Sequence, residues 1–498
     1  MRTLRRGGVL CFALLAASAT GLGTGLAADG QMLARPGWVG SGLSTEMWWK
    51  HPVVYEIDVR SFRDSDGDGA GDLKGVLERL DYVKSLGADA ILLDPMVGAA
   101  GSSEASSPQG TQAAAGPVRL IDPALGTLDD FDKLSEEASR RNIRILLNVV
   151  EPDLGIVRFW VNHGVAGFHP VAATAGAPRT AVGAKATAEE LKKLLGSFSG
   201  QRILVGDADG PSGAQLVLEP SVLLADAGLN AAKLRAALEP VVALEHGVGA
   251  KAVGAGKGAA AKSSGWPMLA SDGYGKARSV TRYGDGTHDT EIAKLVAAVL
   301  LGTRVAAVID DGEELALAGG VMIPWGENPV KAEAVPDAGD APAAAPTPAP
   351  KPVVSDVYVP YVPPKPKPKP WVPPAGSVMA QDADPQSVLS FYRQLSQLHH
   401  GTSAMHDGET IFLNHDDQNV LVWVRKPKAM TPLSPAIVVL CNVSDKPVTL
   451  SLKAETTKLG IRGSFLRTVL RSDAALGSMD LQSMTLAPFQ VYIGAVRY

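Results

Sequence analysis

Apolar residues recur in the N-terminal part of the chain at two alternating spacings. One helix face is predicted from four residues spaced three or four apart, Val76, Leu80, Val83 and Leu86, and Gly87 ends the pattern. Short apolar runs at residues 53–59 and 90–93 flank this helix and predict buried strands. The order strand, loop, helix and strand is the repeating unit of a parallel sheet.

The alternation of strands and helices continues to about residue 309. The predicted strands are 53–59, 90–93, 143–150, 165–168, 202–206, 221–225, 268–271 and 305–309. A helix at residues 128–140 is introduced by Thr127 and Asp130, a variant of the capping box. Eight such strands joined by helices predict an α/β fold closed as a (β/α)8 TIM barrel, here spanning residues 40–400.

From about residue 408 the apolar period changes from that of helices to two. Residues 420–424, 436–441, 448–452 and 489–493 read as strands between turn signals. Residues 405–498 are therefore predicted to form a C-terminal antiparallel β-sandwich domain.

Two further segments differ from both domains. Residues 1–28 combine a basic start, an apolar stretch and a small-residue cleavage site, as a secretory signal peptide does. This predicts a secreted or periplasmic protein with no membrane span in the mature chain; retention as an uncleaved anchor is the alternative. Residues 331–374 are rich in proline and lysine and predict a polyproline II spacer. The spacer is either a ligand for a protein partner, an extended reach, or, as we favour, an insertion in a surface loop.

Charge and composition narrow the function classes. The net charge of −5 and pI near 6.0 provide no basic footprint for nucleic acid. Aromatic residues make up only 5% of the chain, which is low for a protein that stacks rings against sugars. We expect glycan binding, where present, to be weak.

The loop between the first strand and its helix carries a candidate metal site. Its sequence DSDGDGAGD spaces carboxylates two to four residues apart with glycines between them: Asp64, Asp66, Asp68 and Asp72. Carboxylates held closely by a tight backbone can surround one hard cation, and they repel one another without it.

The same stretch resembles the start of the α-amylase family, glycoside hydrolase family 13, in its oligo-1,6-glucosidase-like branch. The resemblance is carried by WW, VVY, RSF, DSDGDGAGDL and LDYVKSLGADAILL, and later by IDPALGTLDDFDKL, GEEL and QDADPQSVLSFYRQL. It implies the barrel and the C-terminal β-domain. It also implies a structural Ca²⁺ ion, or Mg²⁺, held by Asp64, Asp66, Asp68 and Asp72 with the carbonyl of Ala70.

The resemblance further implies a retaining hydrolysis that needs a carboxylate nucleophile and a carboxylic acid. The chain departs from the family at these positions. Where the family has an arginine and the nucleophile it has His169 and Val171, and the general-acid glutamate corresponds to the shorter Asp207. The third family carboxylate lies in an Asn-His-Asp motif that aligns with residues 273–275, Gly-Tyr-Gly.

Two more positions of the family site have changed. The aspartate after the third strand corresponds to Asn148, and the tyrosine that stacks under the sugar corresponds to Asp58. The small domain that normally follows the third strand is missing, because a helix is predicted directly after Asp153.

These departures predict a non-hydrolytic pseudoenzyme of carbohydrate-metabolism ancestry that acts in binding or scaffolding. The alternative is an active α-glucosidase or α-amylase-type hydrolase with a rebuilt carboxylate pair that includes Asp207. Other aspartates near predicted strand ends could complete such a pair: Asp94, Asp226, Asp272, Asp310 and Asp311.

Overall fold

The computed structural model describes residues 47–96, 121–150, 152–171, 186–207, 214–218, 228–245, 265–272, 277–319, 321–327, 372–475 and 477–497. Residues 37–498 form one compact unit. The predicted signal peptide at 1–28 and nearly all of the proline-rich spacer lie outside the described residues, so both remain predictions. Among the helices that are described, none is long and apolar enough to cross a membrane.

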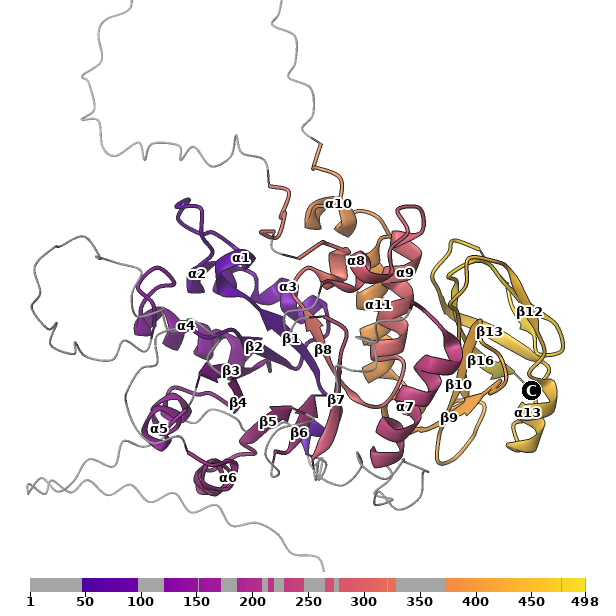
Figure 1. The fold of residues 1–498 in the computed structure, drawn as a ribbon, viewed down its shortest axis with the longest axis horizontal. Helices are drawn as coiled ribbons and strands as arrows, with labels where there is room; N and C mark the ends of the chain where they lie inside the picture. Colours follow the sequence, from indigo (N-terminus) through magenta and orange to yellow (C-terminus); the bar gives the residue numbers. More distant parts are fainter. Residues whose placement is uncertain are drawn as a thin grey trace, which may run out of the picture. The chain divides into compact units, whose positions relative to one another are not determined.

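Eight parallel strands close into a barrel in chain order (Figure 1). They are β1 (Val53–Ile57), β2 (Ala90–Leu93), β3 (Arg144–Val150), β4 (Gly167–Val171), β5 (Ile203–Asp207), β6 (Leu216–Leu218), β7 (Trp266–Ala270) and β8 (Ala306–Asp310). Pairing of β1 with β8, with Val54 opposite Val308, closes the ring. The predicted TIM barrel is confirmed.

Helices cover the outside of the barrel. They are α1 (Val59–Phe62), α2 (Leu73–Glu78), α3 (Leu80–Ser85), α4 (Leu128–Arg140), α5 (Leu154–Asn162), α6 (Ala188–Gly196), α7 (Ala231–Glu245), α8 (Ser279–Tyr283), α9 (Asp289–Leu301), α10 (Val378–Asp382), α11 (Val388–Gly401) and α12 (Ser403–Asp407). Short 3₁₀ turns are found at Trp48–Lys50 and Glu313–Leu315. Side chains inside the ring and between strands and helices are buried and mostly apolar.

Two sequence-based boundaries were wrong. The single helix predicted across residues 76–86 is broken at Arg79 into α2 and α3, although its four apolar residues are all buried as expected. The sixth strand was placed at residues 221–225, which lie outside the described residues, but β6 is Leu216–Leu218. Only the three residues of β6 pair with its neighbours β5 and β7, with Leu216 opposite Val205 and Trp266. A strand of three residues is too short to show a periodic pattern in the sequence.

The C-terminal part is an antiparallel sheet domain, as predicted. Six strands lie in the order β14-β13-β16-β11-β10-β9, beside a two-stranded sheet of β12 and β15. Their bounds are β9 (Glu409–Leu413), β10 (Val420–Lys426), β11 (Ile437–Asn442), β12 (Val448–Leu450), β13 (Phe465–Arg471), β14 (Met479–Asp480), β15 (Met484–Leu486) and β16 (Val491–Arg497), with α13 (Lys453–Lys458) between β12 and β13. Trp423 of this sheet donates its indole N–H to the carbonyl of Gly302, at the end of α9.

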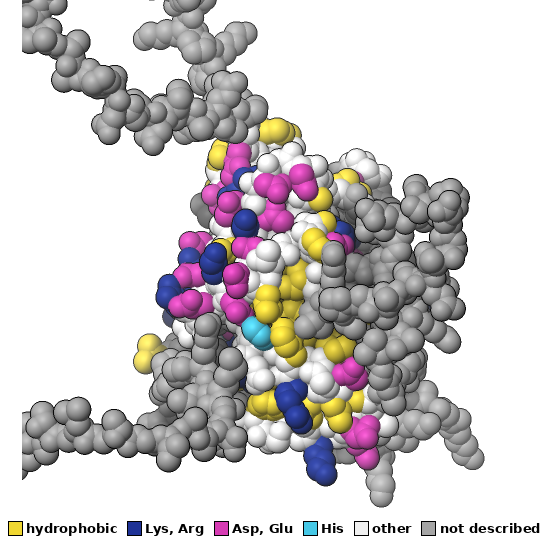
Figure 2. All heavy atoms as spheres, turned by 90° about the vertical axis from the view of Figure 1, so that its left-hand side faces the viewer, with side chains coloured by type: hydrophobic (Ala, Val, Ile, Leu, Met, Phe, Trp, Pro, Cys, Tyr) yellow, Lys and Arg dark blue, Asp and Glu magenta, His cyan; other side chains and the backbone are white. Residues whose placement is uncertain are grey.

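The surface drawn in Figure 2 mixes charges of both signs. On that face, Lys and Arg side chains lie among Asp and Glu side chains rather than in a separate basic stripe.

Candidate functional site

The C-terminal ends of the barrel strands carry a group of polar side chains, among them positions where the resemblance predicts catalytic residues. Strands β3 and β4 are paired in parallel, so Asn148 lies opposite His169 and Val150 lies opposite Val171. Asn148, His169 and Val171, which differ from the residues that the resemblance predicts, are therefore neighbours at the barrel mouth. Enzymes of this fold carry their catalytic groups there.

The side chain of Asn148 connects three strands. Its amide nitrogen donates to Oε1 of Glu56 on β1 and to Oδ1 of Asp94 after β2, both at 2.9 Å. Its oxygen lies 2.7 Å from Nδ1 of His169 on β4. Because an amide oxygen can only accept, His169 carries a proton on Nδ1. An ionised aspartate at position 148 would repel Glu56 and Asp94, so this network requires the amide.

Arg278, the residue before α8, pairs with two carboxyl groups at the end of β8. Its Nη1 lies 2.8 Å from Oδ2 of Asp310, and its Nη2 lies 3.2 Å from Oδ1 of Asp311. The same Nη2 donates to the carbonyl of Asp311 at 2.8 Å. One guanidinium thus serves two adjacent carboxyl groups.

Asp272, which follows β7, is engaged by the chain on both oxygens. Oδ1 accepts the backbone N–H of Ser279 at 2.6 Å, and Oδ2 accepts its hydroxyl at 3.4 Å. Arg282 also lies 3.4 Å from Oδ1. The Asp272 side chain is only about 1% exposed, so the group fixes the start of α8 rather than facing a substrate.

Burial of so many carboxyl groups changes their protonation. Loss of hydration, with repulsion from Asp94 and Asp310, raises the pKa of Glu56 to about 8. Burial raises the pKa of Asp310 to about 7, although Arg278 opposes the shift. Burial likewise raises the pKa of Asp94, and that of Asp311 well above its usual value. A pKa of about 8 means that Glu56 is mostly a neutral carboxylic acid at pH 7, whereas Asp310, with a pKa of about 7, is about half ionised there.

Two buried glutamates, Glu313 and Glu314, follow β8 in the 3₁₀ turn Glu313–Leu315. Glu314 accepts hydrogen bonds from the hydroxyls of Tyr55 and Tyr82, and Glu313 accepts from Ser271 and Tyr392. Both are buried, and burial raises the pKa of each. Through the three tyrosine hydroxyls, the turn after β8 is hydrogen-bonded to β1, α3 and α11.

The remaining sequence-predicted positions have simple structural roles or are not described. Asp58 caps α1 by accepting the N–H of Arg60 at 3.1 Å. Asp153 caps α5, which directly follows β3 and leaves no room for an inserted domain. Asp207 ends β5 and pairs with Leu218 on β6, while its side chain, residues 273–275 and Asp226 lie outside what the structure describes.

Sequence reasoning missed the central position of Glu56. The signal was present, because a glutamate interrupts the otherwise apolar strand VVYEI of a barrel. A charged residue in such a strand needs a partner, and the partner, Asn148, lies on a different strand.

The acidic loop forms a compact cluster outside the mouth. Ligand oxygens of Asp64, Asp66 and Asp72 all lie within 4.8 Å of one another. Asp64 accepts the N–H groups of Gly67 and Gly69, at 2.6 and 2.9 Å, and both glycines have positive φ. These hydrogen bonds lower the pKa of Asp64, which favours its charged form.

The donor set of this loop fits a hard cation, since it consists of oxygens on a tightly turned backbone. Asp72 also accepts the N–H of Gly75 and so anchors the loop to the start of α2. Asp68 accepts the N–H of Ala70 and lies outside the three-residue cluster. The parts assigned to Asp68 and Ala70 therefore remain predictions.

Comparison with known proteins identifies the first part of the barrel. Residues 56–166 match the family model described as the alpha amylase catalytic domain. The chain is 45% identical over 106 residues to trehalose-6-phosphate hydrolase of Escherichia coli (strain K12). It is 42% identical over 104 residues to oligo-1,6-glucosidase of Heyndrickxia coagulans. Each match covers 21% of this chain and 17% of the relative, so most of each relative has no counterpart in these alignments.

Solved structures are similar over a longer part of the chain. Isomaltulose synthase from Klebsiella sp. LX3 superposes with a TM-score of 0.62 at 17% identity, and trehalose-6-phosphate hydrolase of Bacillus licheniformis with 0.61 at 18%. Both comparisons cover 91% of this chain and 100% of the other. They show the fold. The family match ends at Ala166, immediately before β4 begins at Gly167.

Proposed function

We propose that this chain, whose residues 56–166 belong to the alpha-amylase catalytic-domain family, acts as a binding or scaffolding protein and does not hydrolyse glycosidic bonds. The observation that carries the proposal is the end of β4. There the chain reads His169, Pro170 and Val171, in register with the Asn148 strand, and presents no carboxylate.

Retaining hydrolysis requires one ionised carboxylate to attack the anomeric carbon and one carboxylic acid to protonate the leaving group. Valine can do neither. Of the mouth carboxyl groups that the structure describes, Glu56 and Asp94 are partnered by Asn148, and Asp310 and Asp311 by Arg278. The raised pKa of Glu56 favours its neutral form at pH 7, and that of Asp310 leaves it partly neutral. A neutral carboxyl group is a poor nucleophile.

The alternative, an active hydrolase with a rebuilt pair of Asp207 and Asp272, has less support. Both oxygens of Asp272 accept hydrogen bonds from Ser279, the first residue of α8, and Oδ1 lies 3.4 Å from Arg282. A nucleophile needs a free oxygen directed at the substrate, which this arrangement does not offer.

A structural Ca²⁺ ion, with Mg²⁺ as the alternative, is part of the proposal. Asp64, Asp66 and Asp72 would supply its carboxylate oxygens, and the ion would relieve their mutual repulsion. Its effect would be to stabilise the loop between β1 and α2, far in sequence from the mouth residues on β8.

The proline-rich segment is proposed as the contact for a protein partner, in a secreted or periplasmic setting. Described residues on its two sides are hydrogen-bonded to each other: Val378 donates its N–H to the carbonyl of Pro324 at 2.8 Å, and Met379 to that of Trp325 at 3.2 Å. Glu327 is held by Arg63 at 2.9 Å and also by Arg79. A segment that leaves and returns at one fixed base can present a ligand without altering the barrel.

Hydrolysis assays on malto- and isomalto-oligosaccharides test the proposal. We expect the mature chain to release no more glucose than its Asp207→Ala variant. Turnover that depends on Asp207 would instead establish the rebuilt hydrolase.

A further inference from the structure

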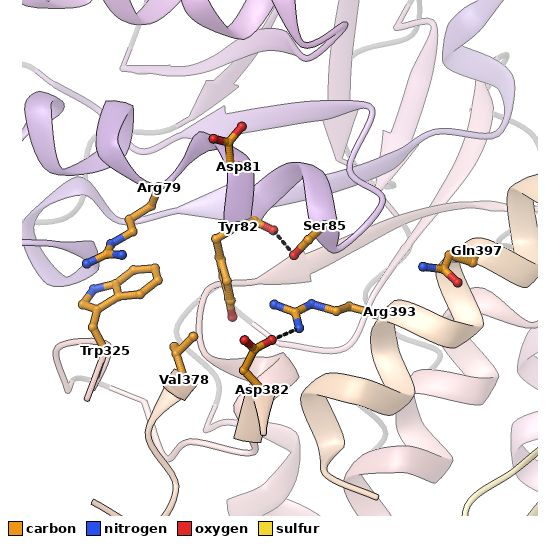
Figure 3. Close-up of a pocket in the computed structure, with 9 residues that line it drawn as sticks. All are labelled: Arg79, Asp81, Tyr82, Ser85, Trp325, Val378, Asp382, Arg393 and Gln397. Carbon is orange, nitrogen blue, oxygen red and sulfur yellow. Dashed lines mark hydrogen bonds and ion pairs between the residues drawn. The ribbon is translucent and has the colours of Figure 1, made fainter. Parts of the chain in front are cut away.

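An open pocket of about 490 Å³ lies on the outside of the barrel, between α3, α10, α11 and the loop that carries Trp325 (Figure 3). Its lining residues lie outside the polar group at the strand ends, although the hydroxyl of Tyr82 donates to Glu314. Its volume falls in the range of ~300–1,000 Å³ that is typical of small-molecule sites.

The charges of the lining are balanced. Two arginines and two aspartates contribute to it: Arg79, Arg393, Asp81 and Asp382. Arg393 forms an ion pair with Asp382, and Asp81 lies 2.6 Å from Arg141 outside the pocket. Glu327 neutralises Arg79. An anionic ligand would have to displace these carboxylates, so the electrostatics favour an uncharged ligand.

The guanidinium groups are held in place before any ligand arrives. Arg79 lies over the ring of Trp325, 4.3 Å from its centre, and Arg393 lies 5.7 Å from the centre of the Tyr82 ring. Figure 3 shows the Tyr82 ring between the two arginines, with Val378 beside it. Preorganised polar groups lose little entropy on binding.

The hydrogen-bonding groups suit a polyhydroxylated ligand. The arginines are donors and the aspartates are acceptors. The exposed Gln397 can do both, and the Ser85 hydroxyl, which donates to the carbonyl of Tyr82 at 2.7 Å, can still accept. Each hydroxyl of a sugar also donates and accepts. The Tyr82 ring and Val378 add an apolar surface for the C–H groups of a sugar ring.

From this combination we propose that the pocket binds a neutral saccharide of one or two rings, apart from the barrel mouth. The proposal rests on the function proposed above, because it gives a non-hydrolytic chain a place to hold a glycan.

Titration of the full-length mature chain with isomaltose tests the proposal, by calorimetry and ligand-observed NMR. Gln397→Ala should weaken binding about threefold to tenfold, the loss expected for one or two hydrogen bonds. Ser85→Trp should fill the pocket and abolish binding. Gln394→Ala, an exposed residue of the same type on the same helix, should bind as the wild type does.

Each other result would overturn the proposal. Equal binding of isomaltose by the wild type and all three variants would place the binding site elsewhere. No binding by the wild type would show that the pocket is not a saccharide site. Pocket-dependent binding of glucose 6-phosphate in preference to isomaltose would assign the site to anions. Release of free glucose, followed in the same NMR spectra, would contradict the non-hydrolytic function independently of where isomaltose binds.

Discussion

Nδ1 of His169 lies 2.7 Å from the side-chain oxygen of Asn148, across the paired strands β4 and β3. These two residues occupy positions where the resemblance to the α-amylase family leads one to expect an arginine and an aspartate. In this chain a neutral amide and a histidine stand at these two positions. The amide oxygen binds His169, and the amide nitrogen connects Glu56 and Asp94.

The first prediction concerns this network and pH. Because the pKa of Glu56 rises from 4.5 to about 8 on folding, its stabilising contribution is complete below pH 4.5 and is lost as pH rises towards 8. The loss should be on the order of 2–4 kcal/mol in the free energy of unfolding. Glu56→Gln, which can still accept from Asn148, should flatten this dependence in urea denaturation between pH 5 and pH 8. An equally steep dependence in the variant would show that Glu56 is not the responsible group.

The second prediction concerns the acidic loop. Calcium at one hundred times its dissociation constant should stabilise the fold by about 2.7 kcal/mol, and a chelator should remove the gain. Asp64→Asn should abolish the effect, because Asp64 belongs to the three-carboxylate cluster. Asp416→Asn is the matched control, because it also removes one exposed carboxylate but lies between β9 and β10, and it should retain the full effect. The measurement is thermal unfolding with and without the ion. A stabilisation that survives Asp64→Asn would place the ion elsewhere.

The third prediction concerns the proline-rich segment. Replacing residues 328–371 by a short Gly-Ser linker should change the Tm by less than about 2 °C, since the base of the segment is fixed by backbone hydrogen bonds. The same deletion should remove binding of any partner that recognises Lys-Pro repeats. Failure of the shortened chain to fold would mean that the segment is a structural part of the barrel.

The fourth prediction concerns the clamp at that base. Glu327→Gln should leave Arg63 and Arg79 without their shared carboxylate. All three side chains are partly exposed, so the cost should be below about 1 kcal/mol. Chemical denaturation measures the difference. Glu78→Gln is the control, because among the described residues Glu78 is paired with Arg63 alone, at 3.6 Å. A loss of several kcal/mol from Glu327→Gln would show that the clamp is far stronger than a surface ion pair.

Much of the fold could be predicted because local signals were strong. Helix α4 begins and ends where the sequence predicts, and the structure confirms its capping box of Thr127 and Asp130. Strand β2 also has its predicted bounds. The break at Arg79 could not be predicted, because Val76, Leu80, Val83 and Leu86 keep the spacing of one uninterrupted helix face.

The site was predictable only where its members are close in sequence. The cluster of Asp64, Asp66 and Asp72 follows from residue spacing in one loop. Glu56, Asp94 and Asn148 lie on three different strands, and only the closure of the barrel brings them together. Their shifted pKa values arise from that burial, which the sequence does not express.

The central claim is the absence of hydrolysis, and turnover measures it most directly. Purified mature chain, its Asp207→Ala variant and the Heyndrickxia coagulans oligo-1,6-glucosidase would be assayed in parallel on aryl α-glucosides, maltotriose and isomaltose, with calcium present. We predict that wild type and variant release product at the same background rate while the control enzyme is active. Turnover by the wild type that disappears with Asp207→Ala would contradict the account and show that the barrel has rebuilt a catalytic pair.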